Sequence, residues 1–214
     1  MNNLEQYLTE HVTKRTDDFE ALEAFAIEHR VPIMEPVSMN FLTQLVRIHQ
    51  PETILELGTA IGYSALRMLD ATPAARLTTV EKDVKMYELA QSNIAKRQKE
   101  SSIVQLQGDA LEVIAELVAN EQTFDFIFID AAKAQYQRFF DAVQPLTKKG
   151  TMIVCDNILF KGYVVDESKI EQKRLRSLTK KIQQFNAELM QNPNYHSSIV
   201  PIGDGVSISV KLNK

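Results

Sequence analysis

Apolar runs of five to seven residues alternate with longer helical stretches between residues 53 and 156. The runs are TILEL (53–57), LTTVE (77–81), SIVQLQ (102–107), FDFIFID (124–130) and GTMIVCD (150–156). Helices are expected from about residue 63, over 84–98, from residue 110 and over 134–145. Strands that alternate with helices of this length indicate βαβ units and therefore a parallel sheet. Nearly continuous apolar strands are typical of a sheet covered by helices on both faces.

The C-terminal segment breaks this alternation. A long helix is expected over 167–191, where apolar residues recur at helical spacing. Two strands follow, YHSSIVPI and GVSISVKL, and only Gly203, Asp204 and Gly205 separate their cores. So short a link requires a hairpin, so the last strand must be antiparallel to its neighbour. The sequence therefore predicts an α/β, Rossmann-like fold whose seven-stranded, mostly parallel sheet ends in an antiparallel hairpin.

The chain shows no sign of a second domain. Three helices are expected before the first strand, over 3–14, 17–29 and 38–49. No repeat, low-complexity tract or Gly/Ser linker interrupts the 214 residues, so we expect one domain, with a helical segment over 1–50 and a Rossmann-like core over 51–214. No run approaches the roughly 18 apolar residues of a membrane span, and the N-terminus lacks the order of a signal peptide. We expect a cytoplasmic protein without a membrane partner.

The chain has a single cysteine, Cys155, in an apolar strand. It is expected to be a small core residue and not a reactive thiol. Without further cysteines the chain has neither a disulfide framework nor a thiolate metal cluster. Any metal ion must therefore be bound by oxygen or histidine.

The turn after the first predicted strand reads ELGTAIGYS over residues 56–64. Its G-x-x-x-G spacing differs from the G-x-G-x-x-G of dinucleotide sites, which favours a cofactor that has an adenosine and no pyrophosphate. Glu81 ends the second strand, where an acid can accept hydrogen bonds from both ribose hydroxyls. Gly108, Asp109 and Ala110 end the third strand, where the same crevice would hold the adenine. Alone, the glycines would indicate only a strand-to-helix turn; the three strand ends together favour a cofactor site.

Polar side chains end the fourth and fifth predicted strands. Asp130 follows FDFIFI, and Asp156 and Asn157 follow GTMIVC. If these strands are neighbours, their carboxyl ends lie about 5 Å apart. Two carboxylates and an amide form an oxygen site suited to Mg²⁺, or to Mn²⁺ or Ca²⁺. Asp and Asn also commonly cap turns after strands, but two adjacent ends of this kind favour a metal site.

These motifs resemble one enzyme family across nearly the whole chain. ELGTAIGYS, VEKD, GDA, IFIDAAK and DNILFKG are similar to the cation-dependent class I S-adenosylmethionine O-methyltransferases, which include catechol and caffeoyl-CoA enzymes. The resemblance implies a metal site formed by Asp130, Asp156 and Asn157, with Lys133 as the base or an electrostatic neighbour. It further implies a cofactor site, which we expect to comprise Met34, Glu56, Gly58, Ser64, Glu81, Asp109, Ala110 and Asp130.

Further matches resemble the bacterial tRNA 5-hydroxyuridine methyltransferases of this family. They are HRVPIMEP (29–36), DAAKAQYQRFF (130–140), DNILFKGYV (156–164), KIEQKRLRSLTKKI (169–182) and VPIGDGVSIS (200–209). This resemblance implies methylation of 5-hydroxyuridine to 5-methoxyuridine at the wobble position of the anticodon. The 5-hydroxyl lies beside the O4 carbonyl, so two vicinal oxygens could contact the metal as those of a catechol do.

The charge distribution favours an RNA substrate. Residues 161–181 contain seven basic and three acidic residues, a net charge of +4, although the whole chain has −4. Neutralising phosphates dominates nucleic-acid affinity. The expected RNA contacts are Arg138, Lys161, Lys173, Arg174 and Arg176. A solvated helix face remains an equal alternative for this segment.

Other functions are also compatible with parts of the sequence. A small-molecule O-methyltransferase for catechols or related phenols is the main alternative. A nicotinamide oxidoreductase is disfavoured by the absence of G-x-G-x-x-G, and a non-catalytic RNA-binding module leaves the paired acids without a reason. Tyr63 and Tyr136 are expected either to stack on a base or to lie in the core. A homodimer is expected from the family resemblance and the N-terminal helices.

Overall fold

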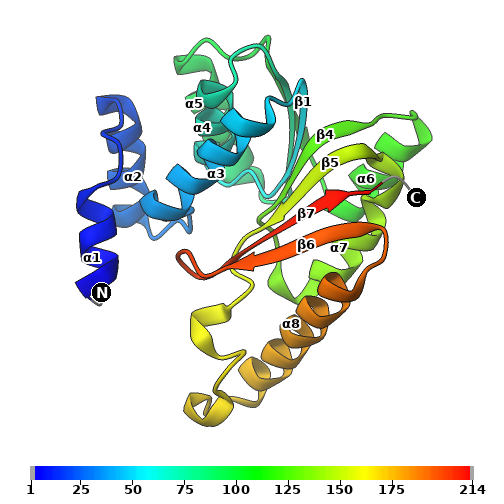
Figure 1. Ribbon diagram of the computed structural model, residues 1–214. Helices are drawn as coiled ribbons and strands as arrows, with labels where there is room; N and C mark the ends of the chain where they lie inside the picture. The colour runs from blue at the N-terminus through cyan, green and yellow to red at the C-terminus, as the bar shows by residue number, and fades with distance from the viewer. Residues whose placement is uncertain (1–2, 213–214) are drawn as a thin grey trace.

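The computed structural model describes residues 3–212, and within them seven strands form one sheet. The strand order is β3-β2-β1-β4-β5-β7-β6, with β7 antiparallel to both of its neighbours and the other pairs parallel (Figure 1). The strands are β1 (Thr53–Leu57), β2 (Arg76–Glu81), β3 (Ile103–Gln107), β4 (Phe124–Ile129), β5 (Thr147–Cys155), β6 (Tyr195–Val200) and β7 (Val206–Lys211). The predicted α/β, Rossmann-like fold with its antiparallel hairpin is confirmed.

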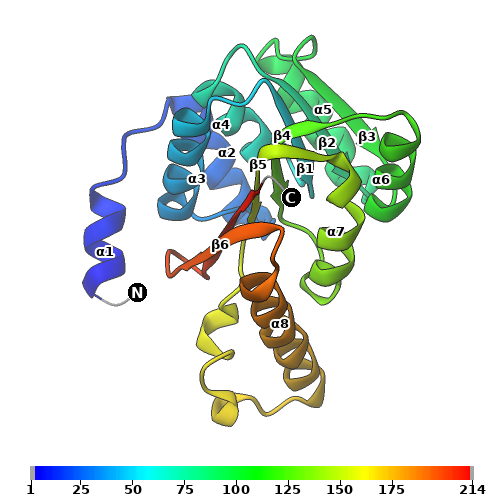
Figure 2. The same cartoon turned by 45° about the vertical axis from the view of Figure 1, so that its right-hand side comes forward.

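Helices cover both faces of this sheet (Figures 1 and 2). The N-terminal helices are α1 (Asn3–Glu10), α2 (Asp17–His29) and α3 (Pro36–His49). The crossover helices are α4 (Tyr63–Ala71), α5 (Val84–Lys96), α6 (Ala110–Ala119) and α7 (Tyr136–Ala142), and α8 (Lys173–Gln191) precedes the hairpin. One apolar core lies between the sheet and α2 to α5, and a second lies between the sheet and α6 to α8. Cys155 is buried in the second core, as expected.

The long C-terminal helix begins later than predicted. The expected range was 167–191, but α8 begins at Lys173, and residues 167–169 form a separate 3-10 turn, η4 (Glu167–Lys169). Ile170 lies between them with an extended backbone, and its buried side chain anchors the segment. Burial of Ile170 therefore overrides the local helical preference. The helix expected over 134–145 is also divided, into η1 (Lys133–Gln135), α7 and η2 (Gln144–Leu146).

Strand register aligns the polar strand ends. Strands β4 and β5 are parallel neighbours, and Ile129 lies opposite Cys155. Asp130 and Asp156 therefore follow paired residues at the same edge of the sheet. The carboxyl ends of β1, β2 and β3 lie at this edge too, because these strands run in the same direction. Within residues 3–212, none of the helices combines the length and apolar character needed to cross a membrane.

Candidate active site

A cavity of about 1140 Å³ lies along the carboxyl ends of the five parallel strands, β1 to β5. Its walls also include the segment before α3 and the tip of the β6–β7 hairpin. The cavity lies where β1 and β4 diverge into crossovers on opposite faces, which is where ligands bind in open α/β sheets. Most of the predicted site residues line it: Met34, Gly58, Ser64, Glu81, Asp109, Ala110, Asp130, Lys133, Asp156, Asn157 and Lys161.

Gly58 lets the chain turn sharply from β1 into the cavity wall. Its φ of 104° is in the region that favours glycine. A methyl group on its Cα would overlap the carbonyl oxygen of Asp130 and lie 2.9 Å from the carbonyl carbon. The glycine is therefore needed for both backbone angle and space, and it brings the ends of β1 and β4 together.

Glu81 and Asp109 order the loops at the far end of the cavity. Glu81 accepts hydrogen bonds from the N–H groups of Ala60 and Asp83, both 2.8 Å long. Asp109 caps α6 through the N–H of Leu111 (3.0 Å). Asp109 also accepts a 2.9 Å hydrogen bond from Lys82, which lowers the pKa of its carboxyl. Glu81 and Asp109 therefore lie at the ends of β2 and β3, as predicted from the sequence.

Glu56 differs from the other predicted cofactor residues because it lies behind the cavity wall. Its side chain is completely buried, and it accepts hydrogen bonds from the hydroxyls of Ser64 and Thr79. Ser64 lines the cavity and lies between Glu56 and the open space. Burial raises the pKa of Glu56 to about 8, against the effect of these hydrogen bonds. At neutral pH the carboxyl is therefore largely protonated.

The raised pKa of Glu56 predicts a pH dependence of stability. The folded protein retains this proton up to about pH 8, whereas the unfolded chain releases it near 4.5. Unfolding therefore releases a proton between these values, and the free energy of unfolding falls as pH rises, by up to about 1.4 kcal/mol per pH unit. Glu56→Gln should flatten this slope in urea denaturation from pH 5 to 8, without cofactor or metal. The exposed Glu100→Gln is the matched control, and an unchanged slope in Glu56→Gln would contradict the assignment.

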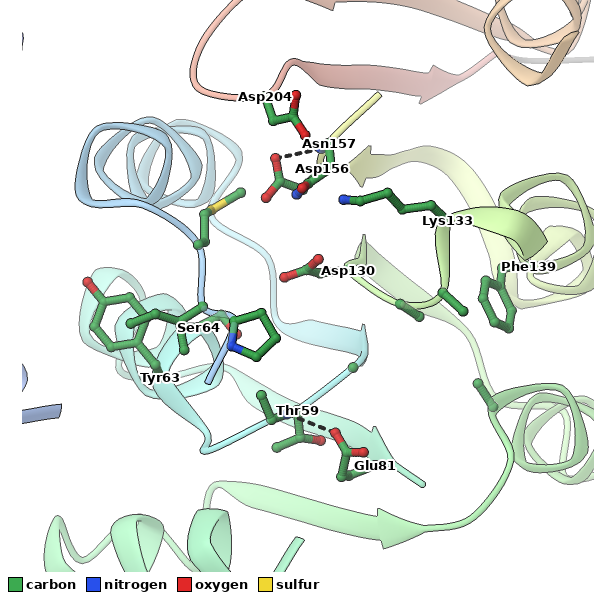
Figure 3. Close-up of a pocket in the computed structure, with 18 of the residues that line it drawn as sticks. Thr59, Tyr63, Ser64, Glu81, Asp130, Lys133, Phe139, Asp156, Asn157 and Asp204 are labelled. Carbon is green, nitrogen blue, oxygen red and sulfur yellow. Dashed lines mark hydrogen bonds between the residues drawn. The ribbon is translucent and has the colours of Figure 1, made fainter. Parts of the chain in front are cut away.

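Asp130, Asp156 and Asn157 converge on one point of the cavity (Figure 3). The Asp156 carboxylate is only 3% exposed and accepts the Asn157 N–H at 2.7 Å. Burial, followed by the neighbouring Asp130, raises the pKa of Asp156 to about 7, and burial raises the pKa of Asp130 as well. Asp156 is buried and Asp130 is half-buried, and two such carboxylates side by side repel one another, so the site favours a cation between them.

The donor set of this cluster fits a hard divalent ion. It offers two carboxylates and an amide, and oxygen ligands of this kind suit Mg²⁺, Mn²⁺ or Ca²⁺. Among residues 3–212, no three His, Cys, Asp or Glu side chains gather closely enough to bind a metal. An ion at this site would therefore use the Asn157 amide beside the two carboxylates. Asn157 has φ 61°, a left-handed conformation that Asn tolerates better than most residues.

Lys133 extends toward this cluster from the other side of the cavity (Figure 3). It is half-buried at the start of η1. Burial lowers the pKa of its ammonium group, and the carboxylates of Asp130, Asp204 and Asp156 oppose that shift. A lysine with a lowered pKa is neutral more often near pH 7 than a solvated one, so its amine is more often available to take a proton from a substrate.

One residue of this region, Asp204, was not predicted to belong to the site. Asp204, at the hairpin tip, lines the cavity beside Asn157 (Figure 3), although its sequence context, GDG between two strands, indicates only a turn. Tyr136 donates a 2.8 Å hydrogen bond from its hydroxyl to the Asp156 carbonyl. Its ring and that of Tyr63 are each 1% exposed, so the core alternative holds for both tyrosines. The Tyr63 hydroxyl donates to Glu23 at 2.5 Å.

The predicted RNA contacts fall into two groups. Lys161 is exposed and lines the cavity, whereas Lys173, Arg174 and Arg176 lie outside it on the first turn of α8. This end of α8 and the segment before it project from the body of the protein (Figure 2). We call the basic face of this projection, formed by these three residues, the basic arm. Arg138 is also exposed outside the cavity and bonds Gln135 at 2.8 Å.

Comparisons with known proteins agree on one class. A sequence profile described as O-methyltransferase matches residues 9–212. The catechol O-methyltransferase of Niastella koreensis is 34% identical over 184 residues, covering 83% of this chain and 81% of its own. The caffeoyl-CoA O-methyltransferase of Populus kitakamiensis is 32% identical over 177 residues, covering 81% and 75%.

Solved structures give the same result. A Staphylococcus aureus protein, provisionally assigned as a caffeoyl-CoA O-methyltransferase, aligns with a TM-score of 0.89 at 34% identity, covering 96% of this chain and 98% of its own. The O-methyltransferase of Bacillus cereus, solved in complex with SAH, aligns with a TM-score of 0.83 at 26% identity and covers 97% and 96%.

Proposed function

This chain belongs to the O-methyltransferase family, and we propose that it transfers the methyl group of S-adenosylmethionine to a hydroxyl oxygen beside Asp130, Asp156 and Asn157. The cofactor part of the proposal is supported by the cavity at the strand ends and by the SAH complex of the Bacillus cereus relative. Glu81 would accept hydrogen bonds from the ribose hydroxyls. Asp109 and Ala110 would lie beside the adenine. Met34, Gly58 and Ser64 would lie toward the methionine end.

The proposed reaction needs a deprotonated oxygen in line with the sulfonium methyl group. Asp130, Asp156 and Asn157 would hold Mg²⁺, or Mn²⁺ or Ca²⁺ in its place, and a divalent ion there would lower the pKa of a neighbouring substrate hydroxyl. Lys133, half-buried beside the acids, would accept the hydroxyl proton at its Nζ. The oxygen then forms a bond to the methyl carbon as the carbon–sulfur bond breaks, which leaves S-adenosylhomocysteine. The cavity walls supply the orientation, which can account for much of the rate.

The substrate that we propose is 5-hydroxyuridine at the wobble position of a tRNA anticodon. The basic arm carries this part of the proposal. Its three exposed cations lie on the first turn of α8, and the segment that leads from β5 to α8 contributes to one wall of the cavity. Figure 2 shows this segment and the start of α8 side by side in the projection. Lys161 connects the two regions, since it is exposed and also lines the cavity. Phosphates on the arm would hold the loop while one base enters. An anticodon loop can present a splayed base without opening a duplex. The sequence matches outside the cofactor motifs support the same substrate.

Nucleoside mass spectrometry of tRNA tests this proposal. A strain that lacks the gene is expected to lose 5-methoxyuridine and to accumulate 5-hydroxyuridine, and the wild-type gene should restore the modification. The double reversal Arg174→Glu/Arg176→Glu should restore it poorly and weaken tRNA binding about tenfold, with a shallower salt dependence. The charge-matched control is Lys96→Glu/Lys99→Glu. These two lysines lie between the end of α5 and the start of β3, away from the basic arm. Unchanged 5-methoxyuridine in the deletion strain would rule out the RNA substrate.

A small-molecule substrate is the second candidate. The observation that favours it is the similarity to catechol and caffeoyl-CoA enzymes. Both candidates present two neighbouring oxygens to the same residues. The purified protein with a catechol and no RNA separates them, because efficient turnover would assign the cavity to phenols and leave the basic arm as a solvated helix face.

The remaining parts of the proposal concern the cellular context. We place the protein in the cytoplasm with tRNA as its partner, and we expect a homodimer. Light scattering of the purified chain measures the assembly directly.

A further inference from the structure

We propose that Asp204 is a positioning residue that fixes the loop bearing Asn157, and with it the geometry of the proposed metal site. The inference rests on the proposed metal-dependent function and adds a residue outside the predicted donor set. The loop, residues 157–161, connects β5 to the segment before α8. Three of its backbone N–H groups donate to the hairpin tip, residues 203–205.

The sheet brings these two distant segments together. Strand β7 is antiparallel to β5, and Ser207 lies opposite Cys155. The residues just before β7 therefore run beside the residues just after β5. Two backbone hydrogen bonds continue the pairing beyond the strands. The Ile158 N–H donates to the Gly205 carbonyl (3.0 Å), and the Leu159 N–H donates to the Asp204 carbonyl (2.9 Å).

The Asp204 side chain makes the third bond, and it reaches the far end of the loop. Its Oδ1 accepts the Lys161 N–H. Other side chains hold the beginning of the loop: Tyr136 donates to the Asp156 carbonyl (2.8 Å), and Asn186 donates to the Ile158 carbonyl (2.8 Å). Asp204 thus restrains a part of the loop that these two contacts do not reach.

The loop needs such restraint because its backbone is unfavourable. Asn157, Phe160 and Lys161 all have left-handed φ values, 61°, 47° and 56°. Each such residue costs free energy, most clearly the bulky Phe160, so the conformation persists only where its surroundings determine it. Without the bond to Asp204, the Lys161 end can relax toward ordinary φ values. The left-handed conformation of Asn157, four residues earlier in the same short loop, is then determined by fewer contacts, and the position of its amide is expected to be less well fixed.

The hairpin tip packs against the loop on one side and against α3 on the other, and the contact with α3 gives it a support outside the loop. Gly205 packs so closely on Leu159 that a methyl group on its Cα would overlap the leucine side chain. On its other side, Gly203 packs equally closely against the Ser38 hydroxyl of α3. Asp204 therefore lies between α3 and the loop, and its bond to the Lys161 N–H holds Lys161 in a fixed place relative to the sheet and α3.

Mn²⁺ binding to the purified full-length chain tests the proposal. Titration calorimetry should give a dissociation constant about tenfold higher for Asp204→Ala than for the wild type, as for other residues that orient metal ligands. Asp204→Asn keeps an oxygen that can accept the Lys161 N–H, so its affinity should stay within about twofold of the wild type. Amide hydrogen exchange at Lys161 should be faster in Asp204→Ala and unchanged in Asp204→Asn. A residue that only stabilises the fold would not change metal affinity.

The controls separate the possible failures. Asp125→Ala also removes a carboxylate that accepts backbone N–H groups. Asp125 lies at the N-terminal end of β4, away from the cavity, so this variant should bind Mn²⁺ normally. Wild-type affinity in Asp204→Ala overturns the positioning role. Equal weakening in Asp204→Ala and Asp204→Asn overturns it too, because that result indicates a role for the charge. If Asp204→Ala does not fold, Asp204→Ser replaces it. A wild-type chain that binds no Mn²⁺ would instead refute the metal-dependent function on which the inference rests.

Discussion

Replacing Asp156 with alanine is expected to lower the rate of methyl transfer about 10³-fold or more while the protein stays folded. The size of the effect follows from the proposed ion, which is worth several kcal/mol of transition-state stabilisation. Each step of about 1.4 kcal/mol changes a rate tenfold. Single-turnover transfer from labelled S-adenosylmethionine, with cofactor affinity measured in parallel, separates lost chemistry from lost binding.

The fold should tolerate this change because the carboxylate is costly where it lies. Asp156 is buried beside Asp130, and its pKa of about 7 reflects that burial and repulsion. The melting temperature of the metal-free Asp156→Ala variant should therefore equal or exceed that of the wild type. The increase that Mn²⁺ produces in the wild type should disappear. Asp130→Ala should behave likewise in the transfer assay, and full wild-type activity in excess EDTA would refute the role of a metal.

Replacing Gly58 with alanine is expected to lower the free energy of unfolding by more than about 3 kcal/mol. The new methyl group must overlap the Asp130 carbonyl oxygen, and the backbone φ of 104° is unfavourable for alanine. The ends of β1 and β4 must separate to make room, which also changes the cavity wall. Thermal unfolding should show a loss of roughly 6–12 °C for a chain of this size. Calorimetry should show weakened S-adenosylmethionine binding.

Gly150→Ala is the matched control for this prediction. Gly150 also has a positive φ, 84°, but a methyl group there has no neighbour within 4 Å. The Gly150→Ala variant should lose only the free energy of holding alanine at a positive φ, about 1 kcal/mol. Similar losses in the two variants would mean that the close approach between Gly58 and Asp130 is not important.

The strand pattern and the polar strand ends could be predicted because they depend on local sequence. TILEL corresponds residue for residue to β1, and acids after apolar runs occur at the edge of the sheet where parallel strands all end. Once β4 and β5 are neighbours, Asp130 and Asp156 must lie together. The beginning of α8 was wrong by six residues, because the buried Ile170 holds an extended backbone that helical periodicity does not reveal.

Side-chain burial at the site could not be predicted. The motif ELGTAIGYS places Glu56 near the cavity, but only the packing of α4 against the sheet puts Ser64 in front of it and raises the pKa of its carboxyl. The same packing buries Tyr63.

The sequence by itself determined the order of strands and helices, the glycine turn and the acids at the strand ends, since each depends on neighbouring residues and a fixed period. Only the tertiary structure decided that Asp204 meets the loop after β5. That contact joins residues 43 positions apart through the antiparallel register of β5 and β7, and long-range hydrogen bonds of this kind leave no periodic pattern in the chain.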